Sequence, residues 1–129
     1  MKTYLIETDI LIDLFNKRDE ANTLITELSK IGRLVSSAVT IAELRSGWDD
    51  KQASYYLPKL YAIVEVMNLT KEIAEYAGKL RNIYGKKGQV LPTVDTLIAA
   101  TCIFNDYTLV TRNIRHYPMK EIDLYKREN

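Results

Sequence analysis

Residues 3–13 read Thr-Tyr-Leu-Ile-Glu-Thr-Asp-Ile-Leu-Ile-Asp, and the fold can be worked out from this segment. Its apolar run, residues 4–6, is typical of a strand that is buried on both faces. The run ends at Glu7 and Asp9, and apolar residues then return at helical spacing from residue 10 to residue 15. The segment therefore predicts a buried strand leading into a helix. Ligands bind outside the carboxyl ends of strands in open α/β sheets, so Glu7 lies where a site is expected.

The same segment also has a purely structural interpretation. Thr8 or Asp9 can cap the helix, and Glu7 can favour the positive end of the helix dipole. Taken alone, the segment supports a structural role and a functional site equally well. The rest of the chain has to decide between them.

The composition indicates one ordinary globular domain, which we place at residues 1–129. Hydrophobic residues make up 47% of the chain and charged residues 27%, and 129 residues suffice for one core. The net charge of +1 gives no overall attraction to nucleic acid, so any such contact must use local basic clusters. No signal-peptide pattern is evident, and no apolar run is long enough to span a membrane. We therefore expect a cytoplasmic protein without a membrane partner.

Strands and helices are expected to alternate along the chain. We predict strands at residues 4–6, 34–36, 63–69, 108–111 and 122–124. Helical patterns lie between them, including a helix from Asp50 in which Tyr61 faces inward and Pro58 argues against continuity. The most apolar helix begins at Pro92 and Thr93. This alternation predicts a three-layer α/β/α sandwich with a central, mainly parallel sheet.

Four polar residues fall where such a sheet would gather them at one edge. Glu7 follows the first strand, Glu43 lies on the helix after the second, Asp95 opens the apolar helix, and Asn113 follows the fourth strand. Oxygen ligands of this kind suit Mg²⁺ or Mn²⁺. A cation held there can activate water and steady a phosphoryl oxygen, as paired metals do in nucleases. The sequence leaves open whether one ion binds or two.

Each member of this set has a simpler interpretation. Glu43 stands three residues after Thr40, which is capping-box spacing. Asp95 in a first helical turn can complement the dipole, although an unpaired charge in so apolar a helix is expensive. Asn113 can be a turn residue. His116 we interpret as structural, and Asp13 as an acid on a helix surface.

The combination of these segments is more specific than any one member. The segments are Ile-Glu-Thr-Asp (6–9), Ser-Ser-Ala-Val-Thr-Ile-Ala-Glu-Leu (36–44), Asp-Thr-Leu-Ile-Ala-Ala-Thr-Cys (95–102) and Leu-Val-Thr-Arg-Asn (109–113). Their order resembles the PIN domain, and most closely the VapC-type toxins of prokaryotic toxin–antitoxin pairs. The resemblance implies a ribonuclease that uses Mg²⁺ or Mn²⁺, a VapB-like antitoxin as partner, and a homodimer.

Residue by residue, the resemblance assigns most of the site. Glu43, Asp95 and Asn113 match the acidic pattern of the family, and Thr8 and Thr111 match its neighbouring hydroxyl residues. Candidates for contacting the phosphates of RNA are basic residues in two clusters, Lys86, Lys87, Arg112 and Arg115.

Glu7 departs from the family, which normally has Asp at this position. Glutamate reaches about 1.5 Å further from the backbone than aspartate, and Mg²⁺ tolerates little error in ligand distance. Unless the backbone recedes, we expect a slower nuclease that works better with Mn²⁺ than with Mg²⁺.

Two other functions fit parts of the sequence. A PIN-like domain that has lost catalysis and acts as a binding partner is consistent with Glu7. A signalling receiver domain also places acids after its first strand, but it needs an Asp after the middle strand and a Lys after the last. Here residues 68–70 read Asn-Leu-Thr and residues 112–113 read Arg-Asn, so neither requirement is met.

Overall fold

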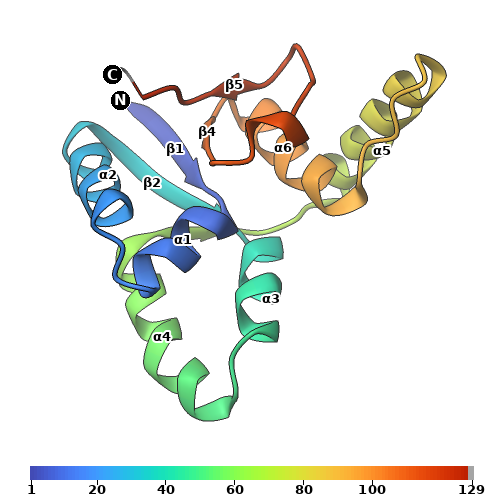
Figure 1. Ribbon diagram of the computed structural model, residues 1–129. Coiled ribbons are helices and arrows are strands. Elements are labelled where there is room, and N and C mark those ends of the chain that lie inside the picture. Colours follow the sequence, from blue (N-terminus) through green and yellow to red (C-terminus); the bar gives the residue numbers. More distant parts are fainter. Residues whose placement is uncertain (128–129) are drawn as a thin grey trace.

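A parallel sheet forms the centre of the fold, and β1 (Lys2–Ile6) is its middle strand (Figure 1). The structure is a computed structural model that describes residues 1–127. The other strands are β2 (Gly32–Ser37), β3 (Glu65–Met67), β4 (Thr108–Val110) and β5 (Asp123–Leu124). They are ordered β3-β2-β1-β4-β5, and each neighbouring pair is parallel. The predicted parallel sheet is confirmed, although β3 is shorter than the segment 63–69 suggested.

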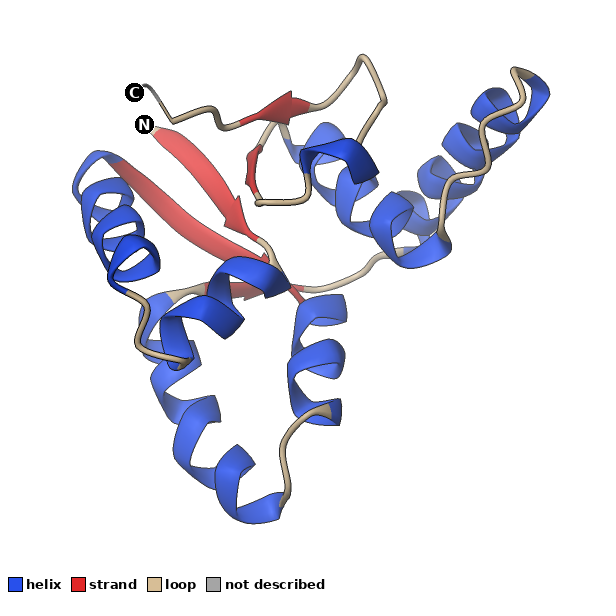
Figure 2. Cartoon of the chain, in the orientation of Figure 1, coloured by secondary structure: helices blue, strands red, loops and turns tan. Residues whose placement is uncertain are grey.

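Helices cover both faces of this sheet, as Figure 2 shows. They are α1 (Thr8–Phe15), α2 (Asp19–Ile31), α3 (Ala38–Ser46), α4 (Asp50–Ile63), α5 (Lys71–Lys86) and α6 (Thr93–Asn105), together with a 3-10 turn, η1 (Ile114–His116). Helix α4 runs through Pro58 without a break, and Tyr61 on it is exposed rather than buried. The predicted three-layer sandwich is therefore the fold.

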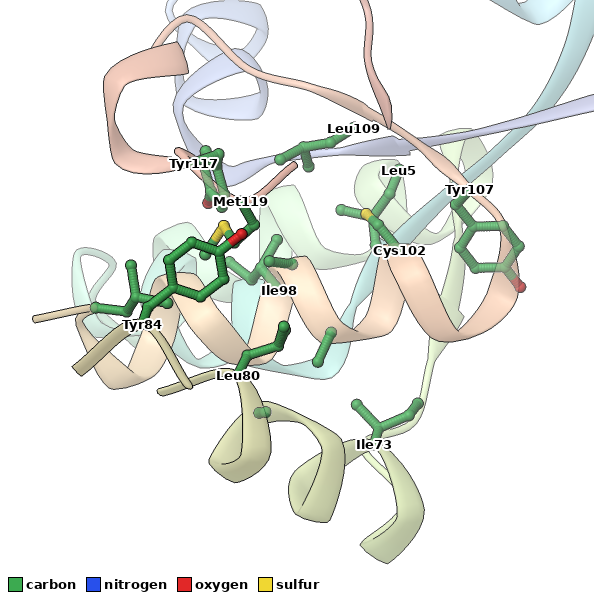
Figure 3. Packing of buried hydrophobic residues seen from close by; sticks show 14 of the residues in the cluster. Leu5, Ile73, Leu80, Tyr84, Ile98, Cys102, Tyr107, Leu109, Tyr117 and Met119 are labelled. Carbon is green, nitrogen blue, oxygen red and sulfur yellow. The ribbon is translucent and has the colours of Figure 1, made fainter. Parts of the chain in front are cut away.

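The alternation of side chains along the strands divides the core into two parts. Leu5 and Leu109 point to the face covered by α5 and α6, where they pack on Ile98 and Cys102 (Figure 3). Tyr4, Ile6 and their neighbours point to the other face, against α1, α2 and α4. Successive residues of a strand point to opposite faces, so a strand that is apolar at every position is buried on both sides.

The order of the strands fixes the place of a site. From β1 the chain moves outward to β2 and β3, and then returns to place β4 on the opposite side of β1. Such a reversal opens a crevice at the carboxyl ends of the two strands, here β1 and β4. Ile6 pairs with Val110, so the next residues, Glu7 and Thr111, stand side by side at this point.

Within residues 1–127, none of the helices is both long enough and apolar enough to cross a lipid bilayer.

Candidate active site

Glu7 is a buried carboxylate at the carboxyl end of β1. Its side chain is only 6% exposed, and its backbone N–H donates to the Val110 carbonyl oxygen at 3.1 Å. The Tyr117 hydroxyl donates to Glu7 Oε1. Among residues 1–127, the other oxygen, Oε2, has no hydrogen-bond partner although it is fully buried. A buried carboxylate oxygen without a partner is costly, and this one is available to a ligand.

The surroundings of Glu7 oppose its negative charge. Burial is the largest cause and raises the pKa of its carboxyl group, and the carboxylates of Asp9 and Asp95 raise it further. The nearby hydroxyl of Thr111 and the hydrogen bond from the Tyr117 hydroxyl lower this pKa in part. A bound cation would favour the ionised form, since opposite charge stabilises it. The ionised Glu7 carboxylate is therefore more stable with a bound cation than without one.

Asp95 lies on the first turn of α6, is partly buried, and is near enough to raise the pKa of Glu7. Burial raises the pKa of its carboxyl group, and the nearby His116 lowers it. His116 Nδ1 is 3.5 Å from Asp95 Oδ2. The two line a hollow of about 330 Å³ together with Arg115, so a predicted site acid and a predicted RNA contact share one surface. His116 therefore has a position at the site, which the sequence did not predict.

Glu43 is connected to the site through Thr8. The Thr8 hydroxyl donates to Glu43 Oε1 at 2.6 Å and lies 3.2 Å from the Thr40 hydroxyl. The capping-box interpretation of Glu43 is wrong, because α3 begins earlier than Thr40. Its cap is Ser37, whose side chain accepts from the Val39 N–H at 3.1 Å.

The segment after β4 is fixed by Asp9, whose role could not be predicted from the sequence. Asp9 Oδ2 accepts from the Arg112 backbone N–H at 2.7 Å and from the Thr111 hydroxyl at 3.2 Å. Arg112 also pairs with Asp13 at 2.8 Å, so Asp13 is more than a surface acid. Neither Thr8 nor Asp9 is the N-cap of α1; that position is Glu7, which makes no side-chain cap. The only feature of the sequence that could have indicated the role of Asp9 is its position two residues after Glu7.

Asn113, Lys86 and Lys87 are all exposed. The Asn113 side chain is exposed, and its backbone N–H donates to the Thr111 hydroxyl at 3.0 Å. Lys86 ends α5 and Lys87 caps it, at the tip of the helix that extends away from the sheet (Figure 1). Of the four basic candidates, Arg115 borders Asp95 most directly.

The three carboxylates do not form a ready-made cluster. Within residues 1–127, no three Asp, Glu, His or Cys side chains are grouped closely enough to hold one metal ion. Each carboxylate instead contacts its own protein partner: Glu7 contacts Tyr117, Glu43 contacts Thr8, and Asp95 contacts His116. What the structure does offer is a set of hard oxygen donors and one buried, unpartnered oxygen. That chemistry fits Mg²⁺ or Mn²⁺.

Comparisons with known proteins point in one direction. The sequence matches the family model described as PIN domain over residues 4–122. Ribonuclease VapC19 of Mycobacterium tuberculosis is 32% identical over 116 residues, covering 89% of this chain and 92% of that protein. Ribonuclease VapC1 of Methanocaldococcus jannaschii is 28% identical over 121 residues, covering 93% and 83%.

Solved structures give the same result. The structure of VapBC2 from Rickettsia felis bound to a DNA fragment from its promoter contains a chain that superposes with a TM-score of 0.86 and 26% identity. The match covers 98% of this chain and 99% of that one. VapBC-1 from nontypeable Haemophilus influenzae superposes with a TM-score of 0.81 and 25% identity. The likeness thus extends over nearly the full length of the chain, and it disfavours the receiver-domain alternative.

Proposed function

This chain belongs to the PIN domain family, and we propose that it is a divalent-metal-dependent endoribonuclease acting as the toxin of a toxin–antitoxin pair. One observation carries the metal part of the proposal: Glu7 Oε2 is buried and unpartnered within residues 1–127, at the carboxyl ends of β1 and β4. The ribonuclease part is supported by relatives named ribonuclease VapC, which match most of this chain.

In this proposal the metal ligands are Glu7, Glu43, Asp95 and Asn113. Glu7 Oε2 and Asp95 would hold the ion directly, Glu43 would hold it directly or through water, and Asn113 would orient a water or complete the shell. Thr8 and Thr111 support them by holding Glu43 and Asp9. A bound Mg²⁺ or Mn²⁺ would supply Lewis-acid stabilisation of the phosphoryl group and a nucleophile made from water.

The chain's own residues then position the RNA. Arg115 borders the hollow beside Asp95, and Arg112 forms an ion pair with Asp13. Lys86 and Lys87 are candidates for contacting a longer RNA along the α5–α6 hairpin. Contacts to phosphates dominate the affinity of such complexes, and the net charge of +1 leaves this task to these residues.

The proposed partners are a VapB-like antitoxin and a second copy of the chain. The supporting observation is that the similar solved structures are of VapBC complexes from Rickettsia felis and Haemophilus influenzae.

A catalytically weakened PIN-like domain that acts only as a binding partner is the second candidate. It is favoured by the engagement of each carboxylate with its own protein partner. The two candidates differ in whether RNA is cut.

RNA cleavage by the parent separates these candidates. Metal binding and cleavage by Asp95→Asn test the assignment of Asp95. We expect Mn²⁺ to raise the melting temperature of the parent protein, since a hundredfold excess over Kd stabilises the native state by about 2.7 kcal/mol. Asp95→Asn removes one ligand charge, so most of this shift and of the RNA cleavage should be lost. Thermal melts with and without chelator, followed by a cleavage assay, measure both. An equal shift and equal cleavage in the variant would contradict the assignment of Asp95, and metal binding without cleavage would favour the second candidate.

A further inference from the structure

We infer that Tyr117 is a positioning residue of this site: its hydroxyl holds one oxygen of Glu7 and thereby presents the other to the metal. This inference rests on the proposed function, because it concerns how the same site is prepared for its ion. The residue lies after the last of the four segments that carry the resemblance, though within the range that matches the PIN domain, and neither its spacing nor its chemistry singled it out in the sequence.

The contact between Tyr117 and Glu7 is well supported by its surroundings. Tyr117 is 3% exposed and packs in the core beside Leu109 and Met119 (Figure 3). Its backbone N–H donates to the Ile114 carbonyl oxygen at 3.0 Å, which ties it to the turn η1. A ring held by packing and by its backbone places the hydroxyl at a fixed point, so the carboxylate that it binds is also fixed.

Tyr117 explains how the site accommodates glutamate at position 7. The Glu7 backbone is held in sheet register by its hydrogen bond to the Val110 carbonyl oxygen. The extra methylene carries the carboxylate about 1.5 Å further out, and a longer side chain has an additional rotatable bond. Tyr117 removes that freedom by binding Oε1. Oε2, which has no partner within residues 1–127, is left as the oxygen for the ion.

A merely structural tyrosine would behave differently. If the hydroxyl only satisfied a buried acceptor, its loss would lower stability and leave metal affinity unchanged. If the hydroxyl positions Glu7, its loss should weaken metal binding when position 7 carries glutamate. The loss should have no effect when the side chain at position 7 is too short to reach the hydroxyl. Residues that orient metal ligands typically change metal affinity by about 10–100-fold.

The experiment is a double-mutant cycle read by Mn²⁺ binding in calorimetry. We compare the parent, Tyr117→Phe, Glu7→Asp and the double variant, in the full chain. Tyr117→Phe should weaken Mn²⁺ binding on the order of tenfold in the parent. In the Glu7→Asp background the same substitution should change affinity by no more than about twofold, within the scatter of independent sites.

Tyr84→Phe is the matched control. Tyr84 is also 3% exposed and its hydroxyl also hydrogen-bonds a carboxylate, that of Glu121 at 3.2 Å, but it is not part of the site. It should lower stability without changing Mn²⁺ affinity. A second measurement needs no substitution in the site: in protein labelled at tyrosine Cζ, Mg²⁺ should shift the NMR resonance of Tyr117 and leave that of Tyr84 in place.

The outcomes separate this inference from the proposed function. If the parent binds Mn²⁺ and Tyr117→Phe binds it equally well, or is weakened equally in both backgrounds, the positioning role is wrong and the metal site stands. A Tyr117 resonance that does not move when Mg²⁺ binds would also overturn the positioning role alone. If the parent binds no ion at all, the proposed function fails, and the role of Tyr117 fails with it.

Discussion

Glu7 carries a charge in a place that disfavours charge, which is common for residues that act on ligands. Burial raises the pKa of its carboxyl group above the ordinary value of 4.5, so ionisation at neutral pH costs the folded protein stability. Titratable groups perturbed in this way gather at functional sites. Ionised Glu7 therefore destabilises the ion-free fold, and a bound ion would offset that cost.

Glu7→Gln should therefore stabilise the protein when a chelator is present. Removing the buried charge should raise the free energy of unfolding at neutral pH by about 1–3 kcal/mol. The folded pKa is raised, so the folded state binds the extra proton, and the stability of the parent falls as pH rises above about 4.5. The difference in the free energy of unfolding between Glu7→Gln and the parent should vanish below about pH 4.5 and grow above it.

Urea unfolding of both proteins across pH measures this difference. Asp95 also has a raised pKa, and its repulsion of the Glu7 carboxylate is part of what Glu7→Gln removes. A variant that is less stable than the parent at neutral pH would show that Glu7 is a structural residue.

At the scale of the element, the segment from β4 to Tyr117 organises the site. Asp9 on α1 accepts from Thr111 and from the Arg112 backbone, and η1 then leads to Tyr117. The Asp9 contacts join residues separated by 102 and 103 positions in the chain. Local patterns carry no information on such contacts, which is why Asp9 and Tyr117 could not be assigned from the sequence.

The elements themselves were largely predictable because their signals are local. Continuous apolar runs located the strands, and helical spacing located the helices. Pro58 was misleading: the carbonyl of Ser54 loses its helical partner there, but both residues are exposed, so water can satisfy it and α4 continues. Glu43 was placed correctly on its helix, whereas its suggested capping role failed because the helix begins at Ala38.

The tip of α5 gives a test of how RNA would lie on the protein. Replacing Lys86 and Lys87 with Ala should flatten the salt dependence of RNA affinity. The logarithmic slope should change by about 0.7 for each single-strand phosphate that the protein no longer neutralises. Binding measured at several salt concentrations gives that slope.

The control for this pair is Lys2 and Lys30 replaced with Ala. Both are exposed, and they lie at or just before the amino ends of β1 and β2, opposite the site. Their removal makes the same change in net charge and should leave the slope nearly unchanged. Equal flattening by both pairs would mean that α5 does not contact the RNA.

At the scale of the whole molecule, the strand order β3-β2-β1-β4-β5 brings Glu7 and Thr111 together. Helix α6 adds Asp95 from one covering layer, and α3 adds Glu43, which contacts Thr8 of α1. The fold followed from the sequence, and so did the elements on which Glu43 and Asp95 lie. The separate engagement of the three carboxylates by Tyr117, Thr8 and His116 did not, because it depends on tertiary packing.

The central claim is that this chain cuts RNA with a metal held by Glu7. The most direct measurement is single-turnover cleavage of one RNA by the parent, Glu7→Asp and Glu7→Gln, with Mg²⁺ and with Mn²⁺. Losing the ligand charge removes several kcal/mol of stabilisation, so Glu7→Gln should be slower by about a hundredfold or more.

The sequence alone predicts that Glu7→Asp is the fastest of the three. With Tyr117 holding the longer side chain, we instead expect Glu7→Asp to be slower than the parent, because misplacement by about 1 Å can cost on the order of a hundredfold. Parent cleavage that requires metal and falls in the order Glu7, Glu7→Asp, Glu7→Gln is the result we predict. Equal rates for the parent and Glu7→Gln would contradict the account.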